Sequence, residues 1–232
     1  MSQFCYINGA ELVMDRRGAL YWPDRKMLVV ADLHFGKGAA FAAAGQLLPP
    51  YDTAATLSLL ETLIATYKPR QVVALGDSFH DEESAARLDG ESDARLRAMV
   101  ESVDWTWIRG NHDPAIEAGL GGAVTEELVV GPLLFRHEAS LGRVQAGEIS
   151  GHFHPKACVR VRQKRLTQRC FVGDPMRLVL PAFGAFTGGL DVLDEAISRL
   201  FADDFRVWLL GRQGVYPFPS RALQPIAPYY AL

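Results

Sequence analysis

Three short apolar runs, each ended abruptly by polar residues, constrain this chain more than any other feature. They span residues 27–31, 71–75 and 105–108. The run 27–31 is continuously apolar and 71–75 nearly so, as expected of strands buried on both faces, and 105–108 is also strand-like. An amphipathic helix is predicted over 53–67, and one or two helices over 82–103. This alternation of strand, polar cluster and helix predicts an α/β fold that holds its ligands at the carboxyl ends of the strands.

The remainder of the chain reads as short strands separated by turns. Apolar segments with Asn-Gly and Arg-Gly turns between them predict strands near the N-terminus, and a hairpin is predicted in the second half. The predicted strands cover 4–7, 12–14, 20–22, 159–165, 168–172, 207–210 and 215–216. The 232 residues suit a single domain over 1–232, with a core of ordinary size.

Composition limits the classes of function. Apolar residues make up 49% of the chain and charged residues 22%, as in ordinary globular proteins. A net charge of −3 provides no overall attraction for nucleic acid, so such a partner requires a local basic patch. No apolar run approaches the ~20 residues of a membrane span. Three scattered cysteines and an N-terminal sequence without a charged leader predict a cytoplasmic protein with reduced thiols.

Five clusters of Asp, Asn and His follow apolar runs in order along the chain. Imidazole and carboxylate donors without thiolates suit Mn, Fe or Zn. In Asp-x-His and His-x-His, alternate side chains of an extended segment point the same way and reach one metal. Any one cluster is usually a polar turn, but the ordered set predicts two metals that clamp a phosphate and supply a hydroxide nucleophile. The clusters are residues 32–34, 76–80, 110–113, 135–137 and 151–155.

This ordered set resembles the calcineurin-like metallophosphoesterases over about residues 28–155. The resemblance implies a four-layer α/β/β/α sandwich. It also implies a complete set of ligands for two divalent metal ions, with one bridging carboxylate. The implied ligands are Asp32, His34 and His154 for one metal, Asn111, His137 and His152 for the other, and Asp77 as the bridge.

The resemblance also implies catalytic side chains. His112 matches the histidine that stabilises the transition state or protonates the leaving oxygen, and Asp113 matches the residue that orients its ring. His80 is similar to a histidine of the nuclease branch, where it faces the substrate phosphate. The alternative for His80 is a partner that orients a metal ligand.

Residues 32–37 and 180–191 narrow the resemblance to the ligase-associated DNA damage response endonuclease (PdeM) family, over nearly the whole chain. That family implies manganese-dependent endonuclease activity on single-stranded DNA in DNA repair. It implies two Mn²⁺ ions, although the donor set also accepts Fe or Zn. It further suggests a repair ligase and helicase as partners.

Four basic residues are expected to contact the backbone phosphates of a nucleic-acid substrate: Lys37, Arg109, Arg160 and Arg162. Lys37 is predicted near a helix start, where anions are favoured, and the alternative is an exposed lysine. Arg160 and Arg162 belong to a basic stretch over 156–169, whose alternative is a solvated hairpin edge.

Two other functions fit the sequence. One is a phosphodiesterase or phosphatase for nucleotides or cyclic nucleotides, and the other is a metal-free interaction module on the same fold. Trp105 and Trp107 are interpreted as core residues rather than base-stacking platforms. The acidic run 81–83 is interpreted as the start of a helix, where the dipole favours carboxylates.

Overall fold

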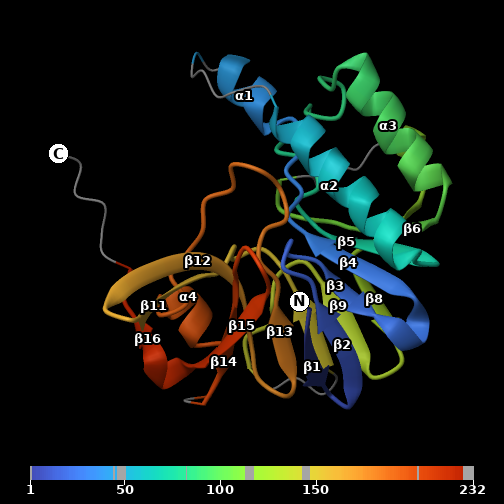
Figure 1. The fold of residues 1–232 in the computed structure, drawn as a ribbon. Helices are drawn as coiled ribbons and strands as arrows, with labels where there is room; N and C mark the ends of the chain where they lie inside the picture. Colours follow the sequence, from blue (N-terminus) through green and yellow to red (C-terminus); the bar gives the residue numbers. More distant parts are fainter. Residues whose placement is uncertain are drawn as a thin grey trace.

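Two β-sheets pack face to face, and helices cover their outer faces (Figure 1). The computed structural model describes residues 2–43, 45, 51–81, 83–112, 118–142, 147–202 and 204–226. The arrangement of two packed sheets with helices on their outer faces confirms the predicted α/β class and the predicted sandwich.

The first sheet has the strand order β1-β2-β3-β4-β5-β6-β7. Its first four strands form an antiparallel meander, and β4 to β7 run parallel. The three apolar runs are thus neighbouring parallel strands, so their carboxyl ends meet at one edge. The strands are β1 (Gln3–Ile7), β2 (Ala10–Met14), β3 (Leu20–Trp22), β4 (Met27–Ala31), β5 (Gln71–Leu75), β6 (Asp104–Ile108) and β7 (Ala123–Thr125).

The second sheet has the order β15-β14-β12-β13-β10-β9-β8, with β11 paired to β12 and β16 paired to β11. Strands β9, β10 and β13 are parallel, and the other pairs are antiparallel. The strands are β8 (Glu127–Val130), β9 (Leu133–Arg136), β10 (Gly147–Ser150), β11 (Lys156–Val161), β12 (Lys164–Gly173), β13 (Arg177–Val179), β14 (Arg206–Leu210), β15 (Val215–Pro219) and β16 (Leu223–Gln224).

The described helices are α1 (Lys37–Ala43), α2 (Asp52–Tyr67), α3 (Gly90–Glu101) and α4 (Glu195–Ser198), with short 3-10 turns η1 (Pro23–Arg25), η2 (Ala118–Leu120) and η3 (Ser220–Ala222). The helix predicted from residue 82 begins only at Gly90, because the Asp89 carboxylate caps α3 by accepting from the Ser92 N–H. The acidic run does not start a helix: Asp81 instead accepts from Ser84 and Arg87. Glu82 lies outside the described residues.

Three apolar clusters hold the layers together. The largest fills the space between the two sheets. A second lies between the first sheet and helices α2 and α3, and it contains both Trp105 and Trp107, which confirms them as core residues. A third packs residues 192–205, including α4, onto the second sheet. The fourth layer is thin because α4 is a single turn.

The three cysteines are free and buried. Burial raises the pKa of the Cys5 thiol to about 12, so this thiol stays protonated and unreactive near neutral pH. Within the described part of the chain, every helix is too short or too polar to cross a bilayer.

A polar cluster ties the β2–β3 turn to the end of α2. The Arg17 guanidinium donates to both carboxylate oxygens of Asp15, at 2.8 and 2.7 Å, and the Tyr67 hydroxyl donates to Oδ2 at 2.8 Å. Burial by itself raises the pKa of Asp15. The hydrogen bonds from Arg17 and Tyr67 together have a larger, opposite effect, so the pKa lies below its ordinary value. The folded state therefore favours the ionised carboxylate.

Replacing Asp15 with Asn is expected to lower the free energy of unfolding at pH 7 by about 1–2 kcal/mol, reduced by solvent screening around Arg17. The pKa of Asp15 in the folded state is below its unfolded value of about 3.9. The stabilisation by the ionised Asp15 carboxylate is therefore fully present at pH values above about 3.9. It is lost as the pH falls through the folded pKa. Urea unfolding of both proteins at pH 7 and pH 3 measures this, and the difference should shrink at pH 3. A difference that is constant with pH, or equal to that of the exposed control Asp24→Asn, would contradict the assignment.

Candidate dinuclear metal centre

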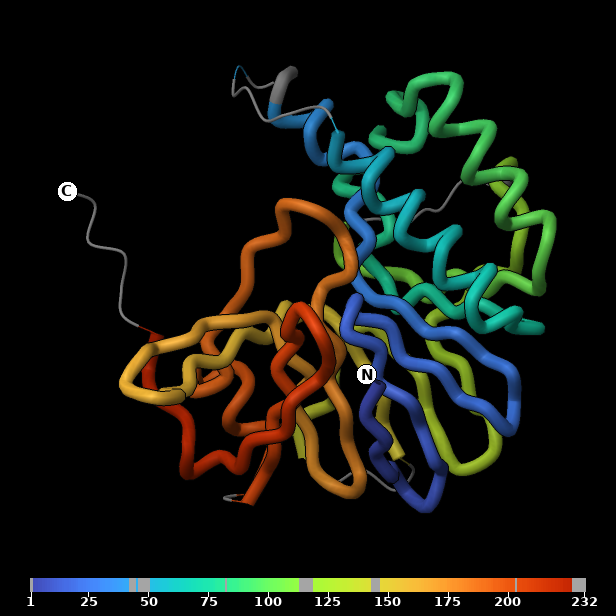
Figure 2. The backbone as a smooth tube through the Cα atoms, in the orientation of Figure 1, coloured from blue at the N-terminus to red at the C-terminus, as the bar shows by residue number. Residues whose placement is uncertain are grey.

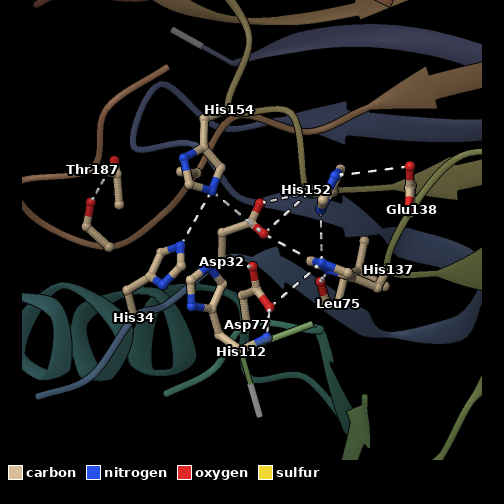
Figure 3. Close-up of polar contacts among 12 residues, drawn as sticks. Asp32, His34, Leu75, Asp77, His112, His137, Glu138, His152, His154 and Thr187 are labelled. Carbon is tan, nitrogen blue, oxygen red and sulfur yellow. Dashed lines mark hydrogen bonds and ion pairs between the residues drawn. The ribbon is translucent and has the colours of Figure 1, made fainter. Parts of the chain in front are cut away.

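The first group of candidate metal donors comprises Asp32, His34 and His154, whose donor atoms all lie within 4.8 Å of one another. Asp32 and His34 follow β4, whereas His154 precedes β11. The two histidine Nε2 atoms are 3.2 Å apart, and His154 Nε2 is 3.6 Å from Asp32 Oδ1 (Figure 3). Residues 120 positions apart are therefore aimed at one point.

The second group comprises Asp77, His137 and His152, which follow β5, β9 and β10. His137 Nε2 is 3.1 Å from His152 Nδ1 and 3.5 Å from Asp77 Oδ1. The two groups adjoin each other: Asp32 Oδ1 is 3.8 Å from the His137 ring, and both Asp32 oxygens accept from the His152 backbone N–H at 3.1 Å. Both sheets thus supply the site.

The backbone at the donors is unusual. Five of them adopt positive φ angles between 44° and 72°, a region that non-glycine residues rarely occupy. Each such residue costs on the order of 1–3 kcal/mol, and this strain concentrates at functional sites. Here it turns the side chains toward the two groups. The five are Asp32, His34, Asp77, His152 and His154.

Hydrogen bonding determines which nitrogen of His137 is available. Its Nδ1 donates to the Leu75 carbonyl oxygen at 3.0 Å, and since a carbonyl only accepts, Nδ1 carries the hydrogen. The Nε2 lone pair is then free and faces Asp77 and His152. A Cβ at Gly76, which has φ 67°, would lie 2.3 Å from His137 Nδ1, so only glycine allows this approach.

The electrostatics favour neutral imidazoles beside carboxylates. Burial and the nearby His154 lower the pKa of His34 to about 3, and burial and His137 lower the pKa of His152. Burial by itself raises the pKa of Asp77. His137 and the His112 N–H together have a larger, opposite effect, so the pKa lies below its ordinary value and the carboxylate is ionised.

These donors fit a pair of divalent cations. Within each group two imidazole nitrogens face each other at 3.1–3.2 Å beside a carboxylate, an arrangement that a cation satisfies. Nitrogen and oxygen donors without thiolates suit Mn, Fe or Zn.

His112 lies directly beside the second group. Its backbone N–H donates to Asp77 Oδ1 at 2.9 Å, and its Nδ1 donates to the His80 carbonyl oxygen at 3.0 Å. Its ring stacks on that of His80, with centroids 5.8 Å apart and 16° between the planes. The side chain is 50% exposed, and its Nε2 lies 4.0 Å from Asp77 Oδ2. Asp113, the residue predicted to orient the His112 ring, lies outside the described residues. Among the described residues, the His80 carbonyl oxygen accepts the hydrogen bond from His112 Nδ1.

Asn111 and two basic residues lie around this centre. Asn111 is exposed and lines a cavity of about 240 Å³ together with Arg109 and His137. Arg109 forms an ion pair of 2.5 Å with Glu126. Lys37 opens α1 and is close enough for its charge to lower the pKa of His80, after the larger effect of burial.

Arg160 and Arg162 are not brought to the metal groups. Arg160 is exposed near the end of β11, and Arg162 lies in the turn of the β11–β12 hairpin. Arg160 is six positions beyond His154 in the chain, which is roughly 20 Å in an extended strand.

Residues 183–187 were given no role from the sequence, and Arg169 was predicted only as a member of the basic stretch 156–169. They line a cavity of about 300 Å³ against α2, next to the first group. The available signal was the segment 180–191, which carried the family resemblance; its one carboxylate, Asp191, belongs to neither donor group.

Comparisons with known proteins agree with this geometry. A family model described as calcineurin-like phosphoesterase matches residues 25–167. The structure of the Pseudomonas putida nuclease MPE is 33% identical, covers 94% of this chain and 100% of its own, and has a TM-score of 0.72. The structure of YfcE, a phosphoesterase from E. coli, is 16% identical, covers 85% of this chain and 99% of its own, and has a TM-score of 0.42. A comparison with curated protein sequences found no match.

The family model spans more than half of the chain, and the nuclease extends the similarity to nearly all of it. Together with the two donor groups, this implies two divalent metal ions and an enzyme that hydrolyses phosphate esters. The chain belongs to the calcineurin-like phosphoesterase family.

Proposed function

We propose that this protein is a manganese-dependent endonuclease that cleaves single-stranded DNA in DNA repair. The observation that carries the proposal is the half-exposed imidazole of His112, held in a defined orientation beside two adjoining metal-donor groups. Similarity to a nuclease over 94% of the chain favours a nucleic-acid substrate over other phosphodiesters.

The proposed metal ligands are the six residues of the two groups together with Asn111, which is carried over from the sequence prediction. Asp32, His34 and His154 would hold one ion, and Asn111, His137 and His152 the other. Asp77 would be shared, since it contacts His137 directly and its charge acts on His34. When bound, two such ions supply Lewis-acid chemistry: they neutralise charge on the phosphate and activate water.

His112 would act on the leaving group. Because its Nδ1–H is committed to the His80 carbonyl, Nε2 is the atom that carries a transferable proton. A protonated Nε2 can stabilise the phosphoryl charge and protonate the leaving oxygen. The stacked His80 ring restricts the orientation of His112 and would face the same phosphate. Asp113 remains a predicted orienting residue.

Basic residues would position the strand. Lys37 lies near His34 and His80, where a backbone phosphate would approach the metals. Arg109 shares its cavity with Asn111 and would contact a neighbouring phosphate. Arg160 and Arg162 would contact only a strand that extends several nucleotides along the β11–β12 hairpin.

A small-substrate phosphodiesterase acting on nucleotides or cyclic nucleotides is the second candidate. It is favoured by the distance of the hairpin arginines from the centre and by the net charge of −3. A small substrate requires only the residues close to the metals.

Circular single-stranded DNA with added Mn²⁺ separates the candidates, because a circle has no ends for an exonuclease. Wild-type protein is expected to linearise the circles, and Asn111→Ala to do so at least about 100-fold more slowly, because a ligand is lost. Glu101→Ala, a change at an exposed position of α3, is the control for contaminating nuclease and should match wild type.

Intact circles together with Asn111-dependent hydrolysis of bis(p-nitrophenyl) phosphate would replace the endonuclease by the small-substrate candidate. Equal rates for wild type and Asn111→Ala on both substrates would refute the site assignment.

A further inference from the structure

The segment 180–191, which links β13 to α4, packs against both chain segments that carry the first metal group (Figure 2). The Gly184 N–H donates to the Asp32 carbonyl oxygen at 3.1 Å, and a Cβ at Gly184 would lie 2.1 Å from the Leu33 oxygen. Further along, a Cβ at Gly189 would lie 2.3 Å from the His154 oxygen. The Thr187 hydroxyl donates to the Gly184 carbonyl oxygen at 3.1 Å (Figure 3). The segment therefore forms a wall of the metal centre.

A cavity of about 300 Å³ lies between this wall and α2. Thr56 of α2, Arg169 of β12 and residues 183–187 line it. The Ala185 N–H donates to Thr56 Oγ1 at 3.2 Å, which fixes the wall to the helix. The cavity is at the small end of ligand pockets, so it suits one nucleotide rather than a duplex.

Arg169 brings an uncompensated positive charge to the cavity. One guanidinium nitrogen, Nη1, donates to the Ala182 carbonyl oxygen at 2.6 Å. Within the part of the chain that the structure describes, no carboxylate forms an ion pair with Arg169, and its register partner on β11 is another cation, Lys156. Burial lowers the pKa of Arg169. The Arg169 side chain is only partly buried. A phosphate that accepts from the N–H groups not directed at Ala182 would provide the missing negative charge.

Phe186 lines the same cavity and keeps its ring partly in solvent. Its φ is 55°, a conformation that a bulky residue rarely adopts, and 51% of the residue is exposed. Strain of this kind, beside a catalytic centre, is typically maintained for function. An exposed aromatic ring next to a cation is the combination by which proteins bind single-stranded nucleic acid, one base stacking per ring.

We propose that this cavity is a subsite for one nucleotide adjacent to the scissile phosphodiester, with its phosphate on Arg169 and its base stacked on Phe186. The inference rests on the proposed phosphodiesterase function and identifies the part of a strand that the metal centre itself does not contact.

The test compares two substrates. Arg169→Gln and Phe186→Ala are expected to lower kcat/KM for a labelled single-stranded oligonucleotide by about tenfold or more, the effect of losing one stacked base or charged contact. Hydrolysis of bis(p-nitrophenyl) phosphate, which has no flanking nucleotide, should stay within about twofold. Phe186→Trp retains a stacking ring and should restore the rate on DNA.

Equal losses on both substrates, or no loss on DNA, would overturn the subsite. If the wild-type protein hydrolyses the small diester but not DNA, the endonuclease proposal fails. A measurement of nucleotide binding then tests whether the subsite exists. Titration calorimetry with thymidine 3′,5′-bisphosphate should show an affinity that is about tenfold weaker in Arg169→Gln. An unchanged affinity, or none in wild type, would refute the subsite independently of cleavage.

Discussion

Replacing Asp77 with Ala is expected to abolish hydrolysis of both DNA and small phosphodiesters, with a loss of at least about 10³-fold in kcat. The same change should reduce bound metal from two ions per chain to no more than one. Asp77 Oδ1 lies 3.5 Å from His137 Nε2 and accepts from the His112 N–H at 2.9 Å. Its removal therefore takes away the proposed shared ligand and a contact that positions His112, the proposed catalytic residue.

Metal content by mass spectrometry and initial rates on both substrates measure this prediction. Asp77→Asn retains the size of the side chain and its acceptor for the His112 N–H but removes the charge, so it should fold normally and still lose activity. Asp93→Asn, which breaks a surface ion pair with Arg97 on α3, is the matched control. Two retained metals with more than a tenth of wild-type activity in Asp77→Asn would exclude a bridging role.

The largest expected effect on stability lies away from the metals, between β10 and β13. Arg177 Nε is 2.8 Å from Glu148 Oε1, and these side chains are 2% and 0% exposed. Arg177 also donates to the Leu200 and Ser140 carbonyl oxygens, at 2.6 and 2.8 Å. Glu148→Ala would leave the guanidinium buried without its carboxylate and should lower the free energy of unfolding by about 3–5 kcal/mol.

Urea unfolding measures this loss, with Arg136→Ala as a control. Arg136 also approaches Glu148, at 3.6 Å, but its side chain is 30% exposed, so its loss should cost less than about 1 kcal/mol. The double variant Glu148→Leu, Arg177→Met should recover most of the stability, because it removes both charges together. Additive losses in the double variant would show that the pair does not interact.

Local pattern was sufficient for most of the secondary structure. Strands β4, β5 and β6 were predicted because a short, largely apolar run is a local property, and the polar residues that end it are also local. Asp32 and Asp77 could be placed at strand ends for the same reason. The helix over 82–103 was partly wrong, since charge pattern alone does not show that Asp89 caps a helix that begins at Gly90.

The sequence by itself determined the donor types, their order and the α/β class, because these depend on residue identity and short spacing. Only the tertiary structure decided which donors meet: His34 and His154 are 120 residues apart, and their approach requires the two sheets to pack. The left-handed backbone at five donors, the tautomer of His137 and the orientation of His112 by the His80 carbonyl are likewise set by contacts between distant segments. The same holds for Arg169, whose charge could be read from the sequence but whose lack of a carboxylate partner among the described residues depends on packing.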